Sequence, residues 1–391
     1  MSQFTEFGRR LRLGVVGGGP SSFIGEIHRA AARLDDRYEV CAAVLSHDPE
    51  RSRAAAAAIG VAPERAYPDW RALLDGEAAR PDGIDVLAIM TPNDSHCDIA
   101  LAALDRGLDV ICDKPLCVSV DEARRLVRKV RDSGLAFCLT HNYTGYPMVR
   151  QARAMVRAGE LGAVRFVKVE YVQGWLAEPV EARPEGTASW RFDPRRAGPS
   201  LVLADIGTHA HHLACYVSGL EVVAISAEVG ALVPGRNVHD FASARLRFDN
   251  GARGTMMVTT AAAGAEHGLM IRLFAEKGTL EWHQEHPNHL LVSPLVGGHR
   301  ILSRGMEGLS PLAERATRVA IGHPEGFHEA FANLYRDAAD VIVARRLGRE
   351  PDPLALAFPT VLDGARGIRL IEAALESNAA EGRWVDCRFM E

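Results

Sequence analysis

The stretch Leu13-Gly-Val-Val-Gly-Gly-Gly-Pro-Ser-Ser-Phe-Ile-Gly25 decides the fold of this chain. An apolar run at residues 11–16 leads into its glycines, and a helical pattern at residues 24–34 follows them. A G-x-G-x-x-G motif requires this order, because small residues let the backbone approach a pyrophosphate at the positive end of a helix. We therefore predict a dinucleotide site at this strand–helix turn. A glycine-rich turn without a ligand is the alternative.

Gly17 and Gly19 match the first two positions of the motif, and its third position falls on Ser22. A stretched turn would give the third role to Gly25 instead. The residues of this turn that we expect to bind the cofactor are Gly17, Gly19, Pro20, Ser22, Phe23 and Ile24.

Short apolar strands alternate with helices through the first 140 residues, which is typical of a parallel, doubly wound sheet. Further strands are expected at residues 39–45, 84–90, 108–112 and 135–139. Further helices are expected at residues 49–59, where Asp48 is placed as the N-cap, and at 94–105 and 120–132. We assign residues 1–140 to a dinucleotide-binding Rossmann domain.

The end of the second strand decides which dinucleotide binds. An acidic side chain there favours NAD, because it excludes a 2′-phosphate. The chain has Ser46-His47-Asp48 at this point, with Arg51 close by. Ser46 beside Arg51 permits NADP, whereas Asp48 can still face the ribose. We expect NAD, and NADP stays open.

Residues 141–391 are predicted to form a second domain, of the α+β class. Helices are expected at residues 146–158, 203–217, 325–345 and 359–376. Short β runs are expected at residues 222–229, 241–248, 254–260, 270–274 and 279–282. Turn signals such as Asp249-Asn250-Gly251 predict hairpins between them, and long loops are expected at 177–200 and 287–312. The fold class is therefore α/β, a Rossmann sheet followed by an open, mainly antiparallel sheet.

The composition excludes several classes of function. The 391 residues include 45 Lys and Arg and 50 Asp and Glu, and the net charge of −5 gives no electrostatic footprint for nucleic acid or an anionic membrane. No apolar run reaches the roughly 18 residues of a membrane span, and residues 1–10 lack the apolar core of a secretory signal. The seven cysteines form no Cys-x-x-Cys pair, so we expect a reducing, cytoplasmic location.

Four further motifs follow in order along the chain. They are Thr91-Pro92-Asn93-Asp94-Ser95-His96, Cys112-Asp113-Lys114-Pro115, Trp190-Arg191-Phe192-Asp193 and Asp205-Ile206-Gly207-Thr208-His209. Together with the glycine turn they resemble the Gfo/Idh/MocA family, over nearly the whole chain. The resemblance implies an NAD(P)-dependent sugar or inositol dehydrogenase of carbohydrate metabolism. It also implies that residues 141–391 bind the substrate and form a homodimer or homotetramer.

By this resemblance, Lys114, Asp205 and His209 form the catalytic triad and contact the substrate. Their chemistry suits alcohol oxidation, since an imidazole can accept the hydroxyl proton and a lysine cation can stabilise the developing alkoxide. Asp205 lies four residues before His209, on the same helix face, where it can orient the substrate or the imidazole. The alternatives are a solvated Lys114 and an Asp205 that caps the helix.

The dense histidine cluster allows one more interpretation. His209, His212 and Asp205 on one face could hold a metal, but no fourth ligand is evident and we expect none. His211 and His212 are interpreted as packing or hydrogen-bonding residues.

The resemblance places Thr91, Pro92, Asn93 and His96 beside the nicotinamide, and a turn that caps the next helix would also explain Pro92-Asn93. Asp113 and Lys114 are also expected to bind the cofactor, and Ser46 and Arg51 are expected near the ribose because they follow the second strand. It implies a cis Lys114–Pro115 bond. Tyr143, Trp190 and Arg191 are candidates to hold a polyol, with structural packing and a surface salt bridge as alternatives. Two departures stand out, Asp113 where the family usually has Glu, and Gly198-Pro199-Ser200 where it often has a run of glycines.

Two rival functions remain. Some relatives oxidise a sugar hydroxyl transiently, eliminate the aglycone and return the hydride, which makes them NAD-dependent glycosidases. Tyr143 and His141 are possible extra acid or base groups for that reaction. The other rival is a non-catalytic nucleotide-sensing protein, against which the intact triad argues.

Overall fold

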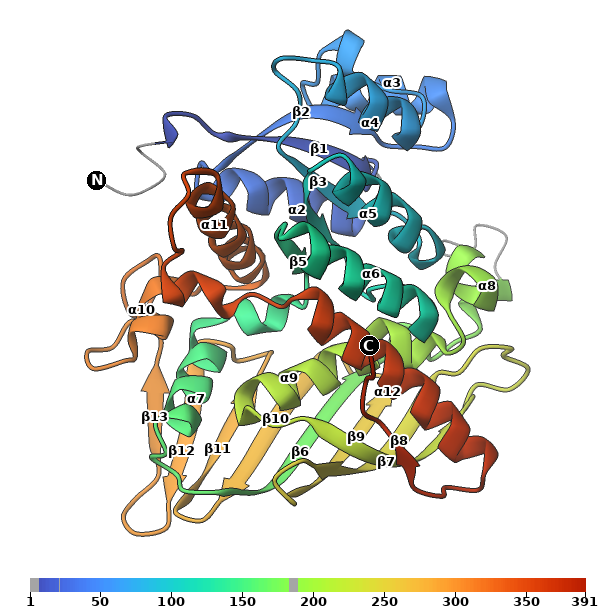
Figure 1. Cartoon of the computed structure of the whole chain (residues 1–391). Coiled ribbons are helices and arrows are strands. Elements are labelled where there is room, and N and C mark those ends of the chain that lie inside the picture. Colours follow the sequence, from blue (N-terminus) through green and yellow to red (C-terminus); the bar gives the residue numbers. More distant parts are fainter. Residues whose placement is uncertain (1–6, 21, 183–188) are drawn as a thin grey trace.

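The computed structural model describes residues 7–20, 22–182 and 189–391. The expectations for residues 1–10 and for the loop at 177–200 therefore fall partly outside the described residues. Figure 1 shows two sheets, one above the other, with helices between them. None of the helices in the described part of the chain is long and apolar enough to span a bilayer.

The first sheet is parallel throughout and has the order β2-β1-β3-β4-β5. Its strands are β1 (Leu11–Gly17), β2 (Tyr38–Val44), β3 (Val86–Met90), β4 (Asp109–Cys112) and β5 (Phe137–Leu139). Its chain order reverses between β1 and β3, and ligands of doubly wound sheets bind at such a point, outside the carboxyl ends of the strands. The predicted Rossmann sheet is thus confirmed.

The helices of this half are α2 (Phe23–Leu34), α3 (Pro49–Ala58), α4 (Trp70–Ala78), α5 (His96–Asp105) and α6 (Val120–Ser133). The Asp48 carboxylate caps α3 as expected, by accepting hydrogen bonds from two backbone N–H groups. Helix α4 was not expected; Asp69 caps its start, and its apolar Leu73 and Leu74 are buried.

The second sheet is mainly antiparallel, as predicted, with the order β13-β12-β11-β10-β6-β9-β8-β7-β14. Only its β6–β9 pair is parallel among the strands described. The strands are β6 (Val164–Gln173), β7 (Val222–Gly230), β8 (Phe241–Phe248), β9 (Arg253–Thr259), β10 (His267–Ala275), β11 (Gly278–His283), β12 (His289–Pro294), β13 (Arg300–Ser303) and β14 (Val385–Asp386).

Two strands correct the loop expected at residues 287–312. Strands β12 and β13 pair there as a hairpin and extend the sheet at one edge. Leu290 and Val292 of β12 are buried, whereas Ile301 of β13 is exposed, as is usual at a sheet edge. The apolar residues of β12 and β13 form runs that are too short, and too close to turn residues, to be recognised as strands from the sequence.

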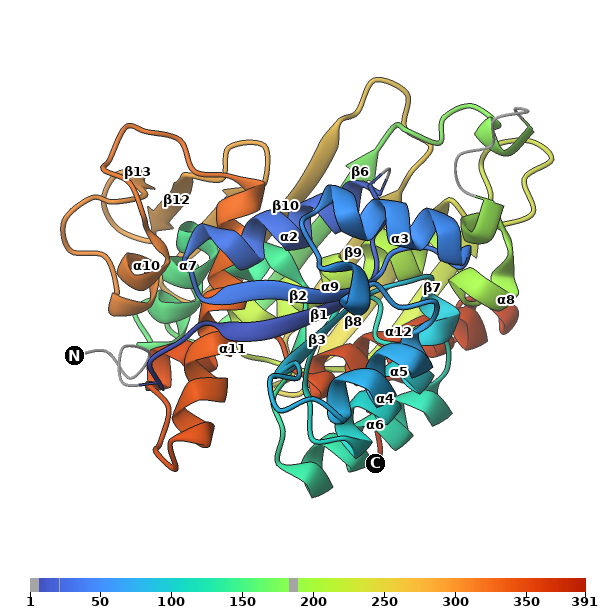
Figure 2. The ribbon, with the colours of Figure 1, turned by 90° about the horizontal axis from the view of Figure 1, so that it is seen from above.

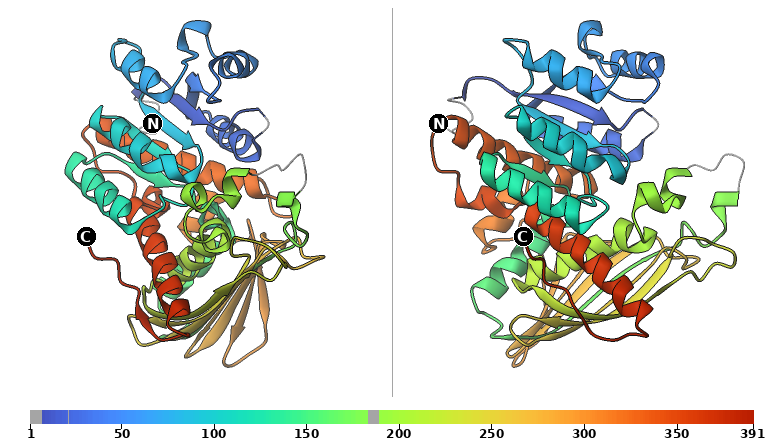
Figure 3. Two further views of the ribbon diagram at one scale, coloured as in Figure 1. Left: turned by 90° about the vertical axis from the view of Figure 1, so that its right-hand side faces the viewer. Right: turned by 45° about the vertical axis from the view of Figure 1, so that its right-hand side comes forward.

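The remaining helices are α7 (Pro147–Arg157), α8 (Pro194–Ala197), α9 (Thr208–Ser218), α10 (Pro311–Ala316), α11 (Phe327–Arg346) and α12 (Val361–Ala379). Helices α7, α9 and α12 pack on one face of the second sheet, and Figure 3 shows no helix on its other face among the residues drawn as ribbon. Helix α11 instead packs against α2 of the first sheet, as Figures 1 and 2 show.

Candidate active site

The glycine turn leaves its backbone bare for a ligand. Gly17 and Gly18 adopt left-handed conformations, with φ of +84° and +65°, which favour glycine. A Cβ on Gly17 would lie 2.5 Å from the carbonyl group of Met90, at the end of β3. A Cβ on Gly25 would lie 2.0 Å from the carbonyl oxygen of Gly18. Gly25, rather than Ser22, therefore fills the third position of the motif, and the turn is the stretched form.

Ser22 has a different role in the same turn. Its Oγ accepts a hydrogen bond from the N–H of Gly25 at 3.3 Å and caps α2. Phe23, the first helical residue, is 71% exposed, so the positive end of α2 opens beside the bare glycine backbone. This donor set and this close backbone fit the pyrophosphate of a dinucleotide. Gly17, Gly19, Ser22 and Ile24 are the residues that would hold it.

The end of β2 presents a fixed carboxylate. The Ser46 Oγ accepts a hydrogen bond from the N–H of Asp48 at 3.2 Å. Asp48 Oδ1 accepts from the N–H groups of Glu50 and Arg51 at 2.9 and 3.1 Å, and these bonds lower the pKa of Asp48. An ionised carboxylate here favours a ribose 2′-hydroxyl over a 2′-phosphate.

Lys114 and Asp205 join the two halves of the chain. Lys114 follows β4, and its Nζ donates to Asp205 Oδ1 at 3.0 Å and to the Asp205 carbonyl oxygen. Asp205 lies inside a π-helical turn, Leu203–Gly207, that precedes α9, so it does not cap a helix and that alternative is wrong. Burial opposes its ionisation, but the charges of Lys114 and Arg191 lower the pKa of Asp205 below its usual value. The Lys114–Pro115 peptide bond is cis, as expected.

His209 lies on the first turn of α9, with 7% of its surface exposed. Its Nδ1 is 3.4 Å from Nδ1 of His141, and the ring of Tyr143 meets it edge to face at 4.8 Å between centroids. Burial and the charge of Lys114 hold the pKa of His209 well below its ordinary value, although Asp205 opposes this. His209 is therefore neutral near pH 7 and able to accept a proton.

The Asp113 carboxylate is held by neighbouring groups of the protein. Its Oδ1 accepts from the Lys114 N–H at 2.9 Å and from Thr140 Oγ1 at 3.0 Å, and it lies 3.9 Å from His28 Nε2. Burial opposes ionisation, but His28 and Lys114 lower the pKa of Asp113 below its usual value. Nδ1 of His28 is 2.7 Å from the hydroxyl of Tyr335, on α11. Nothing in the sequence around His28 indicated this contact.

The segment after β3 forms a 3₁₀ turn, Asn93–Ser95, but no side chain there caps α5, so the capping alternative for Pro92-Asn93 is wrong. Asn93 Nδ2 donates to the carbonyl oxygen of Ala197 at 2.8 Å, and Ser95 Oγ donates to Thr91 Oγ1 at 2.7 Å. His96 is buried, with its two ring nitrogens 2.8 and 2.9 Å from the carbonyl oxygens of Pro115 and Thr91. His96 thus connects the loops after β3 and β4.

Two aromatic side chains contact His209: Tyr143, in the turn after β5, and Tyr171, on β6 of the second sheet. The hydroxyl groups of Tyr143 and Tyr171 share a hydrogen bond, and burial raises the pKa of both phenols. Tyr171 was not expected, although buried and less buried positions alternate over residues 167–173 of β6 and mark its inward face. Trp190 stacks under the guanidinium of Arg191, which lies 4.5 Å from the ring centroid.

The histidine cluster of α9 is packed rather than arranged around an ion. No group of three or more His, Cys, Asp or Glu in the described ranges could hold a metal. His212 stacks on His141 at 4.6 Å and lies 3.9 Å from Asp363, while His211 contacts Cys215 Sγ at 3.4 Å.

The ends of β1, β3, β4 and β5 therefore bring the glycine turn, the 91–96 segment, Lys114 and His141 to one edge of the first sheet, where α9 adds His209. A Rossmann sheet with a lysine, a carboxylate and a neutral histidine at its carboxyl edge defines a class, the nicotinamide-dependent oxidoreductases.

Family models agree with this class. Residues 11–143 match the model described as an oxidoreductase family with an NAD-binding Rossmann fold, and residues 149–281 match the GFO/IDH/MocA C-terminal domain. The chain is 33% identical to the uncharacterized oxidoreductase YfiI of Bacillus subtilis, over 96% of each protein. The chain belongs to the Gfo/Idh/MocA family, and its first domain is the family's NAD-binding domain.

Solved structures of relatives extend the comparison. An inositol dehydrogenase homologue from Azotobacter vinelandii, complexed with NAD⁺, has a TM-score of 0.91 and 38% identity over 97% of each chain. That homologue has also been solved with NADH and myo-inositol. The levoglucosan dehydrogenase of Pseudarthrobacter phenanthrenivorans is 27% identical over 97% of this chain and 98% of its own length. A levoglucosan dehydrogenase complex with NADH and levoglucosan has a TM-score of 0.84, over 98% of this chain and 100% of that chain.

Proposed function

We propose that this protein oxidises a secondary hydroxyl of a sugar, a sugar derivative or an inositol, with NAD as the hydride acceptor. One observation carries the proposal. The Lys114 ammonium is held by Asp205 at 3.0 Å, and burial together with this charge lowers the pKa of His209 at the edge of the sheet where the glycine turn lies. The relatives that bind inositol or levoglucosan together with NADH support this substrate class.

The three side chains divide the work of alcohol oxidation. When bound, the nicotinamide accepts the hydride from the carbon that carries the hydroxyl. Lys114 donates a hydrogen bond to the substrate oxygen and stabilises the negative charge that develops there. His209 takes the hydroxyl proton and becomes an imidazolium. Asp205 holds the Lys114 ammonium in place, and its negative charge stabilises that imidazolium.

A neutral polyol suits the side chains around these groups. The hydroxyl groups of Tyr143 and Tyr171 can bind sugar hydroxyls, and the aromatic faces of Tyr143 and Trp190 suit C–H edges. Arg191 brings a cation near Asp205, where it can bind a hydroxyl or an anionic substituent.

The test is cofactor reduction with purified protein and a panel of sugars, anhydrosugars and inositols. The proposal expects net formation of NADH with at least one polyol, and faster turnover with NAD than with NADP because of Asp48. Release of an aglycone from a glycoside without net NADH would instead identify the glycosidase. Tight NAD binding without turnover of any substrate would leave the nucleotide-sensing function.

We propose further that the division near residue 140 separates the cofactor domain from the substrate domain, and that the uncovered face of the second sheet forms a homodimer or homotetramer. On the sheet face opposite α9 and α12 lie the half-buried Met257 and the exposed Arg245. The chain segment around Glu381 lines the same hollow. Light scattering at several protein concentrations tests the assembly, and a stable monomer would overturn it. All seven cysteines are unpaired, which supports a cytoplasmic location.

A further inference from the structure

The histidine that follows β5 contacts His209 but belongs to none of the motifs above. We propose that His141 is a positioning residue, which accepts a hydrogen bond from His209 Nδ1–H and so leaves Nε2 of His209 free to take the substrate proton. This inference rests on the proposed function, because it concerns the base of that reaction.

The backbone holds His141 firmly in place. Its N–H donates to the carbonyl oxygen of Leu139 at 2.9 Å, and its carbonyl oxygen accepts from Thr144 Oγ1 at 3.0 Å. Its ring meets that of His209 at 80° and stacks on His212 at 17°. With 2% of its surface exposed, His141 has little room for another rotamer.

The contact joins Nδ1 of one ring to Nδ1 of the other, at 3.4 Å. Between two neutral imidazoles one nitrogen must donate and the other must accept. If His141 donated, the proton of His209 would sit on Nε2, and no lone pair would remain for the substrate. If His209 donates, Nε2 is free, and the bond survives when His209 becomes an imidazolium. Only this second arrangement serves both protonation states of a base.

The charges around the pair favour the same tautomer. Lys114 is the cation whose charge acts most strongly on His209, and an ammonium prefers to face a lone pair rather than an N–H group. The other polar groups that face His209 are carboxylates or aromatic rings: Asp113, Asp205, Tyr143, Tyr171 and His212. For His141 to accept at Nδ1 it must be neutral, and burial together with His212, His209 and Lys114 lowers its pKa well below the ordinary value.

Two variants distinguish a role of His141 as a hydrogen-bond acceptor from a role in packing alone. His141→Asn can place an amide oxygen near the position of Nδ1, whereas His141→Leu fills similar space and offers no acceptor. We expect His141→Leu to lower kcat about 100-fold, the scale of a misplaced general base, with KM and the Kd of NAD little changed. His141→Asn should recover most of that loss. His211→Asn, which removes a buried imidazole of the same cluster, serves as the matched control and should keep kcat near that of the wild type.

A readout without turnover completes the test. NMR of the ring nitrogens in histidine-labelled protein, with His209 assigned through His209→Gln, should show the wild-type His209 protonated on Nδ1 and a shift toward Nε2 in His141→Leu. Protonation on Nε2 in the wild type, or an unchanged kcat in His141→Leu, overturns the inference. If no polyol is oxidised, the proposed function fails, while the NMR measurement still decides the role of His141. The same measurement on His141→Asn applies if the leucine variant does not fold.

Discussion

Burial and the charge of Lys114 together lower the pKa of His209. The carboxylate of Asp205 holds the Lys114 ammonium at 3.0 Å. A base with a lowered pKa is a weaker proton acceptor but is always ready, which suits oxidation near neutral pH. In the proposed reaction the same cation would also lower the energy of the alkoxide. Lys114 would then act on both the base and the developing product.

The first prediction removes this cation. Lys114→Ala should lower kcat about 10²- to 10³-fold, the scale of losing one stabilising donor, while the Kd for NAD stays close to that of the wild type. Steady-state kinetics and fluorescence titration with NAD measure the two quantities. Lys168→Ala, which removes a half-exposed lysine paired with Glu170 on β6, is the control. Wild-type turnover in Lys114→Ala would rule out Lys114 as a catalytic residue.

The second prediction follows from the lowered pKa of His209. Because the base must be neutral to act, kcat/KM should stay level as the pH falls through the ordinary histidine range near about 6.5, and should decline only below it. In Lys114→Ala the pKa of His209 should rise, so the residual activity should decline at higher pH than in the wild type. Profiles of kcat/KM against pH measure both limbs. An acid limb at the same pH in the two proteins would contradict the coupling.

The sequence could place those residues whose position depends on local order. Gly17 ends β1, Lys114 follows β4 and His209 lies on α9, so their place at the sheet edge follows from the alternation of elements. His28 and Tyr171 reach the site only through tertiary packing, from α2 and β6. Their contacts depend on how the two halves meet, which no short motif records.

Helix α9 concentrates buried histidines, which makes stability depend on pH. Burial lowers the pKa of His211 to about 3 and also lowers those of His209 and His212. Below the unfolded pKa of about 6.5, the unfolded chain binds protons that the folded chain does not, so stability falls as the pH falls.

The third prediction measures that loss. The free energy of unfolding should decrease between about pH 7 and pH 5, at up to roughly 1.4 kcal/mol per pH unit for each buried histidine. Urea titrations at several pH values give the slope. His211→Asn should reduce the slope by about one histidine's share, whereas the same change at the exposed His47 should not. Equal slopes in His211→Asn and the wild type would contradict the assignment.

The fourth prediction concerns α12, which packs over the loop that carries Lys114. A Cβ on Gly364 would lie 2.6 Å from Leu139 Cδ2 and 2.8 Å from Leu116 Cβ, two residues after Lys114. Gly364→Ala should therefore destabilise the protein by about 1–3 kcal/mol through overpacking. Gly367→Ala in the same helix meets its nearest atom at 3.5 Å, and it should stabilise by up to about 1 kcal/mol through helix propensity. Urea midpoints measure both, and equal effects would refute the close approach.

The elements that matched expectation have either a regular pattern of apolar residues or clear capping and turn residues at their ends. Helix α3 has a capping Asp48, and β8, which was expected over its full length, alternates between buried and less buried positions. The hairpin of β12 and β13 has two short strands at a sheet edge, where half the positions are polar or exposed. Edge strands take their pairing from a neighbour, so their own residues carry a weak signal.

At the scale of the whole molecule, α11 from the C-terminal half of the chain packs against the first sheet. Arg345 reaches Asp109 at 2.6 Å, and Arg346 reaches Asp85 at 2.9 Å, both at the amino end of the first sheet. Tyr335 of the same helix contacts His28. Residues far beyond 140 thus complete the packing of the Rossmann sheet, which a division by sequence position alone would not indicate.

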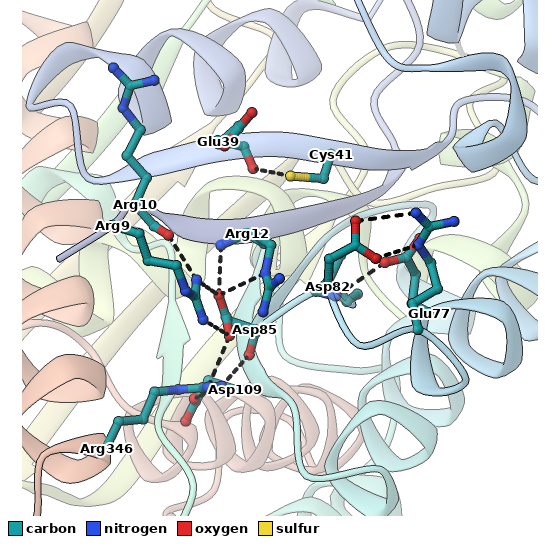
Figure 4. A network of polar contacts seen from close by, with 12 residues as sticks. Arg9, Arg10, Arg12, Glu39, Cys41, Glu77, Asp82, Asp85, Asp109 and Arg346 are labelled. Carbon is teal, nitrogen blue, oxygen red and sulfur yellow. Dashed lines mark hydrogen bonds and ion pairs between the residues drawn. The ribbon is translucent and has the colours of Figure 1, made fainter. Parts of the chain in front are cut away.

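The fifth prediction concerns the centre of that junction. Asp85 is buried and faces Arg9 at 2.6 Å, Arg346 at 2.9 Å and Arg12 at 3.7 Å, as Figure 4 shows for this network. Asp85→Asn would remove the carboxylate that Arg9, Arg12 and Arg346 share, although Arg346 keeps Asp109 at 3.7 Å, and should lower the free energy of unfolding by about 3 kcal/mol.

The matched control is Asp82, three residues earlier. Its carboxylate pairs with Arg80 at 2.9 Å but is half-exposed, so Asp82→Asn should change the free energy of unfolding far less than Asp85→Asn. Urea unfolding compares the two variants, and proteolysis within α11 should accelerate only in Asp85→Asn if the helix is held by this junction.

Burial opposes ionisation of Asp85, but Arg9, the Arg12 N–H and Arg346 keep its pKa lowered. The stabilisation is therefore present at neutral pH and is lost as the pH falls below about 4. The difference between the two variants should therefore shrink in acid, and a difference that stays constant would mean that Asp85 acts through packing rather than charge.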